Sequence, residues 1–489
     1  MLVLTFFTVF SISTMHIKVS APDLPVHNID TGKDYATIQE AIDASETSDG
    51  HTIVVDDGMY NENVTINKSV RLHGASQNTT IIDGNGADNV VSLTASGAEI
   101  AGFTMRNGSN GISLQFVENV NVTDNKVLNC SYGIFIHECS KCKTEKNTAI
   151  STSQAGIYLS KSVRTLIINN TIADTIHGVW LLDYSTNNTI SNNFVSNNPQ
   201  GIVASYNCNN NTIIGNTVTS SSFNLGGDIV MEGAYNNTIY HNNLLGVKQA
   251  WIYEGSLNFW DDGTEGNFWK DYLGSDLDED GIGAPYTIDE NNTDNHPLMG
   301  NFTDFNVAWE EESHHVYIIS NSTISDFAFK VTYEPEIRKR ISFNVTGEDG
   351  TVGFCRVMVP TVLVNYSYYV MVQGEEVDVK VLDISNDTHA YLYFTYTSTT
   401  KHVVIVPEFL SALILPFFMI LAIFAAVFQR KTITVGRKTR GYTLVIRGKA
   451  TCQNLKKLTV LLRHNVYIHD WKRNFYTHTK QKLTEKGVV

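Results

Sequence analysis

Residues 111–177 of this chain consist of three similar segments, GISLQFVENVNVTDNKVLNCSY (111–132), GIFIHECSKCKTEKNTAISTSQA (133–155) and GIYLSKSVRTLIINNTIADTIH (156–177). Two further segments follow at 178–200 and 201–222, so the opening glycines recur every 22 or 23 residues. Each segment holds two or three short runs of strand-forming residues. This period predicts that each segment makes one turn of a coil, and that successive coils stack as parallel strands about 4.8 Å apart.

A second residue type recurs with the glycines: Asn125, Asn147, Asn170, Asn193, Asn216 and Asn243. Asparagine tolerates the left-handed backbone of a tight turn, and its amide can hydrogen-bond to the coils above and below. Leucine-rich repeats have a similar period, but they need a leucine skeleton that these segments lack. The sequence therefore predicts an all-β fold whose main part is a parallel β-helix.

The ends of such a stack must be covered. Near the N-terminal end, Thr37 and Glu40 have the spacing of a capping box. The helix that they predict would turn its apolar face, Ile38, Ala41 and Ile42, toward the first coil.

The stretch 257–289 follows the last segments and is rich in aromatic residues and carboxylates. We interpret it as a C-terminal cap rather than a catalytic segment. Asp276, Asp278 and Asp280 are candidate calcium ligands, because the spacing D-x-D-x-D-G brings oxygens around a hard cation. It is not an EF-hand, since Thr287 stands where the bidentate glutamate would be.

The charge of the chain is divided by the apolar run FLSALILPFFMILAIFAAVF (409–428). Forty-eight acidic and twenty basic residues precede Arg430, whereas fifteen basic and two acidic residues follow from there. The run predicts a transmembrane helix over 407–429, with the acidic part outside and a basic cytoplasmic tail over 430–489. Residues 1–21 resemble a signal peptide. The acidic outer part disfavours nucleic acid as a partner.

Sixteen Asn-x-Ser/Thr sequons lie between Asn63 and Asn386, and none follows the apolar run, which agrees with an external location. Six cysteines are too few for a disulfide scaffold. Cys139 and Cys142 form a CxxC pair without a second metal-binding pair, so we expect plain thiols or one local disulfide.

Several motifs carry a family resemblance: YATIQEAID (35–43), VRLHGAS (70–76), the Gly–Ile/Asn coils and the NFWDDGTEGNFW closing segment (258–269). They resemble the NosD-type right-handed parallel β-helix of the pectin-lyase-like group, which is abundant in archaeal surface proteins. The resemblance implies a β-helix over 30–300. The family name implies copper delivery. The outer histidines His137, His177, His241 and His296, however, occupy different positions within their coils, so the repeat does not align them into a copper-binding cluster.

Residues 302–405 resemble the small Ig-like β-sandwich modules that follow such helices. Alternation of apolar and polar residues in ISFNVTG (341–347) and YLYFTYT (391–397) predicts strands independently. The segment VPEF (406–409) before the apolar run resembles the PEF-type C-terminal sorting signal, which implies processing by an archaeosortase. Such proteins usually end just after the basic residues, whereas this chain continues to Val489.

Side chains alternate along a strand, so residues one and three positions after each repeat glycine should point inward. The residues two positions after the glycines should point outward: Ser113, Phe135, Tyr158, Trp180 and Val203. Phe135, Tyr158 and Trp180, beside Lys161, are candidate ligand-binding residues for a sugar. The competing interpretation is that stacked aromatic residues only stabilise neighbouring strands.

Glu138 and Asp183 are the only carboxylates in this region that we consider for catalysis. They lie two coils apart, roughly 9.6 Å between backbones, which is compatible with an inverting glycosidase. Lys161 lies between them and would hold both acids ionised, so no proton donor is left.

The sequence therefore favours a membrane-anchored surface protein that presents a binding face to extracellular glycans or envelope proteins. A polysaccharide lyase or hydrolase on the same fold is the alternative, and NosD-like copper handling is the second alternative. Calcium is the one cofactor that we expect.

Overall fold

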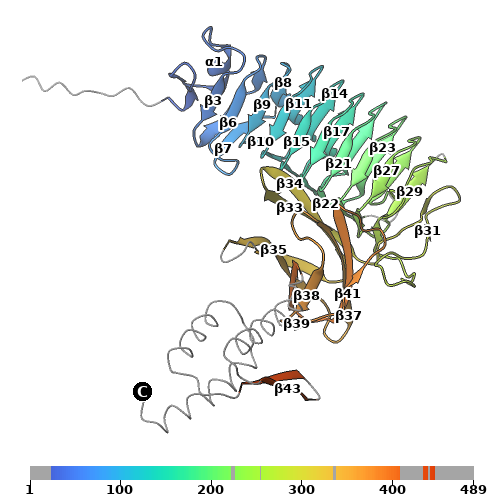
Figure 1. Cartoon of the computed structure of the whole chain (residues 1–489). Helices are drawn as coiled ribbons and strands as arrows, with labels where there is room; N and C mark the ends of the chain where they lie inside the picture. Colours follow the sequence, from blue (N-terminus) through green and yellow to red (C-terminus); the bar gives the residue numbers. More distant parts are fainter. Residues whose placement is uncertain are drawn as a thin grey trace, which may run out of the picture. The chain divides into compact units, whose positions relative to one another are not determined.

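The computed structural model describes residues 24–86, 88–221, 226–253, 255–333, 338–407, 433–438 and 441–446. They belong to two compact units, Met1–Glu408 and Phe409–Val489. The described part of the second unit is an antiparallel hairpin of β43 (Ile433–Lys438) and β44 (Gly441–Ile446). The first unit contains a stack of coils followed by two antiparallel sheets (Figure 1).

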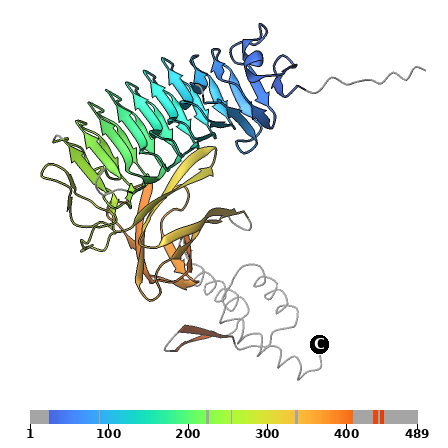
Figure 2. The ribbon, with the colours of Figure 1, turned by 180° about the vertical axis from the view of Figure 1, so that it is seen from behind.

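Three sheets run along the stack, and successive coils add one strand to each (Figures 1 and 2). Sheet A contains β2 (Lys33–Tyr35), β1 (Val26–Asn28), β3 (Thr52–Val55), β6 (Arg71–Gly74), β9 (Glu99–Ala101), β12 (Asn121–Thr123), β15 (Lys143–Glu145), β18 (Leu166–Ile168), β21 (Thr189–Ser191), β24 (Thr212–Ile214) and β27 (Thr238–Tyr240). Sheet B contains β4 (Gly58–Tyr60), β7 (Thr80–Asp83), β10 (Thr104–Arg106), β13 (Lys126–Leu128), β16 (Thr148–Ile150), β19 (Thr171–Ala173), β22 (Phe194–Asn198), β25 (Thr217–Ser220), β28 (Asn243–Leu244) and β30 (Phe268–Trp269). Sheet C contains β5 (Val64–Ile66), β8 (Asn89–Leu93), β11 (Asn110–Gln115), β14 (Tyr132–His137), β17 (Ala155–Ser160), β20 (His177–Leu182), β23 (Gln200–Ser205), β26 (Ile229–Glu232) and β29 (Ala250–Tyr253). The pairing is parallel from β3 onward, so the predicted parallel β-helix is confirmed.

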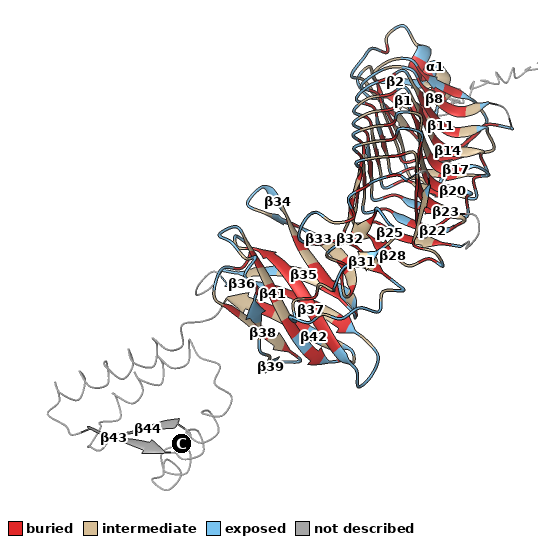
Figure 3. Cartoon of the chain, turned by 90° about the vertical axis from the view of Figure 1, so that its right-hand side faces the viewer, coloured by how far each residue is buried: buried red, intermediate tan, exposed pale blue. Residues whose placement is uncertain are grey.

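The core lies inside the coils, where Figure 3 shows the buried residues in red. The predicted inward rows are confirmed, since each of their side chains is at most 1% exposed: Ile112, Ile134, Ile157, Val179, Ile202, Leu114, Ile136, Leu159, Leu181 and Ala204. The repeat glycines are required because the opposite strand backs directly onto them. A Cβ on Gly178, for example, would lie 2.3 Å from Val195 Cγ1 in sheet B.

The recurring asparagines form a continuous buried ladder between sheets A and B. The backbone N–H of Asn147 donates to Asn170 Oδ1 at 2.9 Å, and Asn170 N–H donates to Asn193 Oδ1 at 2.9 Å. The Asn170 amide also donates to the Thr144 carbonyl of the preceding coil at 3.0 Å. Each side chain therefore connects three coils and satisfies the buried backbone at the turn, where no strand partner exists.

The sixth member of the ladder is Asn242, so the prediction of Asn243 is wrong by one position. Asn216 N–H donates to Asn242 Oδ1 at 2.9 Å. The turn between β26 and β27 is one residue shorter than the turn between β23 and β24, and Asn243 instead points outward from β28. A second ladder, which the repeat analysis missed, follows the turn from sheet C to sheet A: Asn188, Asn211, Asn237, Asn258 and Asn292.

The N-terminal cap is the predicted helix, α1 (Ile38–Asp43). Thr37 accepts a hydrogen bond from the Glu40 N–H at 3.1 Å, and the Glu40 carboxylate accepts from Ala36 N–H at 3.3 Å. Ile38 and Ile42 are fully buried in the coil core. The predicted helical cap is therefore confirmed.

The C-terminal end of the coil core is covered by two Asn-Phe-Trp tripeptides. Asn258 and Asn267 continue the two ladders, while Trp260 and Trp269 are at most 1% exposed against the last coil. Two side chains on and beside β32 (Thr293–Asp294) terminate the ladders. Asn292 Oδ1 accepts from Asn258 N–H and Trp260 Nε1 at 3.1 Å, and Asp294 Oδ2 accepts from Asn267 N–H and Trp269 Nε1 at 2.8 Å.

Residues 301–407 form two five-stranded antiparallel sheets. The first contains β33 (Asn301–Trp309), β34 (Glu312–Ser320), β37 (Val352–Pro360), β41 (His389–Thr397) and β40 (Lys380–Val381). The second contains β35 (Thr323–Thr332), β36 (Arg338–Thr346), β42 (Lys401–Pro407), β38 (Tyr368–Val372) and β39 (Glu375–Glu376). Phe343 and Phe394 belong to one core that both sheets share, so the two sheets pack as a sandwich.

A buried polar network joins this sandwich to the last coils. Arg356 of β37 donates to Glu265 Oε1 from Nε and Nη2, both at 2.7 Å, and Glu265 Oε2 lies 2.7 Å from His241 Nε2. Asn243 accepts from the Phe302 N–H and donates to the Phe302 carbonyl, so β33 begins directly against sheet B. Because both charges of the ion pair are buried, breaking it would leave an unpaired charge away from water.

The predicted signal peptide over 1–21 lies outside the described residues. So does the predicted membrane segment over 407–429, apart from its first residue, and most of the tail over 430–489. Within the described ranges, no helix has the length and apolar character needed to cross a bilayer.

The ladder predicts unequal effects for two adjacent asparagines. Asn188→Ala removes the acceptor of Thr165 N–H and both interactions of its amide, with Ser162 O and with Asn211. We expect a loss of about 3 kcal/mol in the free energy of unfolding of the full-length chain, measured with urea. Asn187→Gly is the matched control, because Asn187 is exposed with φ 58° and glycine accepts that backbone. Equal losses in the two variants would contradict the structural role of the ladder.

The end of the first ladder predicts a pH dependence of stability. Burial raises the pKa of Asp294 to about 6, although Trp269 and Asn267 donate to its carboxylate. The folded state then binds more protons than the unfolded state between pH 4 and 6, so the free energy of unfolding falls as pH rises through that window. Urea unfolding at pH 4, 5, 6 and 7 should show a smaller fall for Asp294→Asn than for the unaltered chain, by up to about 3 kcal/mol. Parallel pH curves for the two proteins would exclude this contribution.

Candidate functional site

The predicted aromatic stripe lies on the outer side of sheet C, where Phe135, Tyr158 and Trp180 are in register on β14, β17 and β20. Phe135 and Tyr158 stack with centroids 4.9 Å apart and planes at 15°, and Trp180 meets Tyr158 edge-on at 5.4 Å. His177 stacks on Trp180 at 4.2 Å. One face each of Phe135 and Tyr158 is therefore occupied by the other ring, and one face of Trp180 is occupied by His177.

Two members of the predicted outward row are buried instead. Ser113 is 1% exposed and Val203 is 3% exposed. In the strand register Ser113 is the partner of Phe135, and Val203 is the partner of Trp180. This burial shows that the stripe contributes cross-strand packing, whatever else it does.

A more exposed row of side chains lies where the sheet C strands end, and we call it the edge row: Phe116, Glu138, Lys161, Asp183, Tyr184 and Tyr206. All six have positive φ values, so each marks a left-handed turn that directs its side chain away from the core. Phe116, Tyr184 and Tyr206 are 68%, 63% and 52% exposed. Sequence reasoning missed Tyr184, because the turn after β20 is one residue longer than the turn after β17 and Tyr184 falls outside the columns counted from the glycines. The adjacent pair Asp183-Tyr184 was the signal that could have shown it.

Two charged members of the edge row, Lys161 and Glu138, form an ion pair, and Lys161 contacts Asp183 through the backbone. Lys161 Nζ lies 3.3 Å from Glu138 Oε1, and the Lys161 backbone N–H donates to the Asp183 carbonyl at 3.0 Å. The lysine thus lies in the coil between the two catalytic candidates, as the sequence predicted. The paired Glu138 carboxylate and the Lys161 ammonium can both hydrogen-bond to hydroxyl groups of a ligand.

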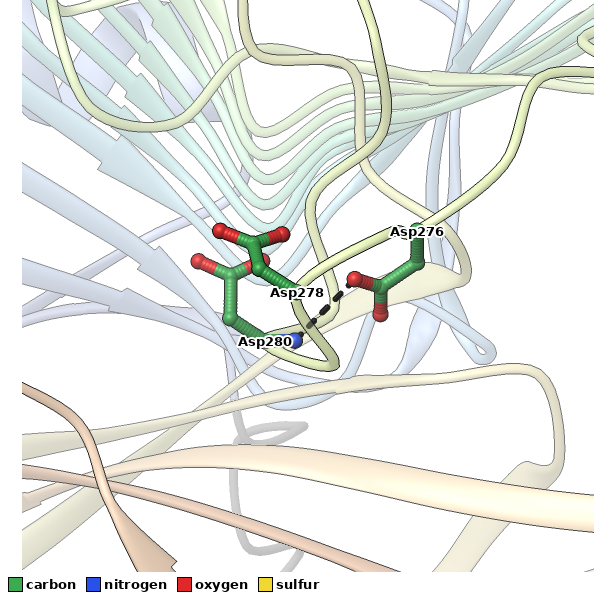
Figure 4. Close-up of side chains that lie close together, drawn as sticks. All are labelled: Asp276, Asp278 and Asp280. Atoms are coloured by element: carbon green, nitrogen blue, oxygen red, sulfur yellow. Dashed lines mark hydrogen bonds between the residues drawn. The ribbon is translucent and has the colours of Figure 1, made fainter.

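The aspartate loop in the C-terminal cap brings three carboxylates together (Figure 4). One oxygen from each of Asp276, Asp278 and Asp280 lies within 4.8 Å of the others. Asp276 accepts from the Asp280 and Gly281 N–H groups at 3.1 and 2.8 Å, which fixes the loop. Burial raises the pKa of Asp280, and its two neighbouring aspartates add to that effect. An oxygen-only donor set of this kind fits calcium.

The sandwich contacts the same loop. Arg356 Nη1 lies 2.7 Å from the Asp280 carbonyl and 3.3 Å from Asp280 Oδ2, and Lys380 Nζ donates to the Asp278 carbonyl at 2.6 Å. Two cations therefore already compensate part of the negative charge of the loop. Asp278 is exposed, and its carboxylate is the one of the three that neither caps the loop backbone nor pairs with Arg356.

The histidines considered for copper lie with different neighbours: His137 beside Glu138, His177 on Trp180, His241 beside Glu265 and His296 beside Asp261. Among the residues that the structure describes, the aspartate loop is the only group of three or more side chains placed to share a metal ion. The five described cysteines are free and buried, and burial raises the pKa of Cys208 to about 12.

Comparisons with known proteins agree with the fold. Residues 44–274 match the family described as periplasmic copper-binding protein (NosD). A cell surface glycoprotein of Methanothermus fervidus is 36% identical over 105 residues, which cover 21% of this chain and only 17% of that protein.

Solved structures include an alginate lyase from Paenibacillus, with 14% identity over 45% of this chain and 94% of that one, and a TM-score of 0.26. Tailspike protein 2 of bacteriophage CBA120 has 12% identity over 76% of this chain and 77% of that one, and a TM-score of 0.32. Sequence identities and TM-scores as low as these say nothing about the activity of this chain. The family match and the three parallel sheets together support a NosD-type parallel β-helix over residues 44–274.

Proposed function

We propose that this protein is a cell-surface β-helix protein that binds extracellular glycans, or envelope proteins that carry them, on the outer face of sheet C. The observation that carries the proposal is the edge row, where three aromatic rings more than half exposed lie beside a lysine–carboxylate pair. Exposed aromatic rings offer flat apolar faces to sugar rings, and the charged groups can hydrogen-bond to hydroxyls.

The external location is supported from several directions. The matching family is described as periplasmic, and the relative from Methanothermus fervidus is named a cell surface glycoprotein. The sequons before residue 409 and the basic residues after residue 429 fit a chain whose folded part lies outside. Anchoring through the apolar run, and its processing by an archaeosortase, are part of this proposal.

A glycan array with the full-length chain tests the proposal. We expect binding that falls at least tenfold in Tyr184→Asn/Tyr206→Asn, because asparagine keeps the left-handed turns and removes both exposed rings. Trp180→Val, which extends the valine row of Val203 and Val230, tests the stripe separately. Phe259→Thr is the control, since Phe259 is 58% exposed in the cap.

The outcomes separate the alternatives. Binding that is lost only with Trp180→Val would move the site from the edge row to the stripe. Cleavage of a bound uronic-acid polymer that disappears in Asp183→Asn would favour an enzyme. Stoichiometric copper binding would favour copper handling, and no binding to any glycan would contradict the proposal.

We also propose that the aspartate loop binds calcium and thereby stabilises the C-terminal cap. Three carboxylates within 4.8 Å of one another repel in the absence of a cation, and a bound ion would relieve that repulsion. Because Asp280 also contacts Arg356, the ion would act at the junction between cap and sandwich.

Thermal unfolding of the full-length chain tests calcium binding. Calcium at a hundred times its dissociation constant should stabilise the folded state by about 2.7 kcal/mol and raise Tm, and EDTA should reverse the shift. Asp278→Asn should abolish the shift without unfolding the loop, because the loop backbone is capped by Asp276. Glu290→Gln, an exposed carboxylate elsewhere in the cap region, should retain it. A Tm that does not change with calcium would reject the site.

A further inference from the structure

A surface hollow lies on a different face, at the corner where sheet A turns into sheet B. A cavity of about 280 Å³ opens there beside β33. Residues 302–304 of β33 line it together with coil residues, and Asn192 Nδ2 of the coils reaches Asp304 Oδ2 of β33. Asn169 and Asn192 occupy successive coils of the turn, and Gly215 follows in the next one. A Cβ at Gly215 would clash with Asn192 Oδ1, so the Asn192 side chain occupies the space above this glycine.

Polar groups from both parts of the molecule line this cavity. Asp304 of β33 is fixed from two sides, since His315 Nδ1 lies 2.9 Å from both of its oxygens and Asn192 Nδ2 lies 3.4 Å from Oδ2. Thr217 and Thr303 also belong to the lining, and the Thr217 hydroxyl accepts a hydrogen bond from Asn243 Nδ2 at 3.2 Å. The cavity therefore offers amides, hydroxyls and one oriented carboxylate, a mixed set of donors and acceptors.

One apolar wall completes the site. Phe194 is 49% exposed on the outer side of sheet B. In the strand register it lies between Thr171 and Thr217, so a single aromatic ring interrupts a row of threonines. An isolated, half-exposed ring contributes little to packing with its neighbours, unlike the stacked rings of sheet C, and its face remains available to a ligand.

We propose that this corner binds one unit of a neutral sugar. Sugar hydroxyls match the mixed donors and acceptors, and the apolar side of a sugar ring matches the face of Phe194. Among the described lining residues there is no lysine or arginine to favour an anion, and one carboxylate is too few for a divalent cation. The volume lies just below the range of about 300–1,000 Å³ for larger ligands, which suits a single ring.

This inference does not depend on the edge row, because the two sites use different sheets. If both hold, one molecule would bind glycans on two faces and could connect them. The site also needs the sandwich, since β33 supplies Asp304 and Thr303. The coil stack alone would therefore lack two of the six polar residues of the lining, including its one carboxylate.

The test is binding of neutral methyl glycosides, namely glucoside, galactoside, mannoside and N-acetylglucosaminide, to the full-length chain by saturation-transfer NMR and calorimetry. The protein should come from a host without N-glycosylation, because Asn169 begins a sequon. Phe194→Thr continues the threonine row and should weaken binding at least tenfold. Asp304→Asn, which keeps the side-chain size, should weaken it as well. Phe259→Thr in the cap, at a residue that belongs to neither proposed site, should leave it unchanged.

Absence of binding by all four glycosides at millimolar concentration would overturn the inference, as would binding that is equal in Phe194→Thr and the unaltered chain. Binding that Tyr206→Asn alone removes would support the edge row and overturn the corner site. Conversely, a loss confined to Phe194→Thr and Asp304→Asn would support the corner site even if the glycan array finds nothing at sheet C.

Discussion

The hydrogen bond from a backbone N–H to the asparagine side chain of the next coil is the interaction on which the structure depends. Strands within sheets satisfy their own backbone groups, but the turns between sheets A and B have no such partners. Asn147, Asn170 and Asn193 supply them, each bridging the coil before and the coil after. Because every member is buried and bonded, the ladder fixes the length of each coil at that turn, and with it the register of all three sheets.

A ladder of this kind has to end somewhere, and its termination explains the acidic and aromatic segment after the coils. Asn292 and Asp294 accept the last backbone N–H of each ladder together with an indole N–H. The tryptophans that donate these bonds also cover the core. The cap is then held from outside by Arg356, so the sandwich is attached to the coils by a buried ion pair rather than by a flexible linker alone.

Since the inside of each coil is determined by the core rows and the ladders, variation is possible only at outward and left-handed positions. The aromatic and charged residues of the edge row occupy such positions, and so do Asn169, Asn192 and Gly215 at the opposite corner. Binding residues at turns can change without disturbing the stack. The scaffold therefore separates the requirements of folding from those of recognition.

The sequence by itself determined the period of the coils, the inward rows, the capping helix and the position of the aspartate loop, because each of these follows from local spacing. It also pointed to Phe135, Tyr158 and Trp180, but not to their mutual stacking or to Tyr184. Register shifts such as Asn242 for Asn243, the second ladder, and the contacts of Arg356 with Glu265 and of Asp304 with Asn192 were decided only by the tertiary structure. These interactions join residues in different coils or on separate sheets, and no local pattern in the sequence records which distant side chains will meet.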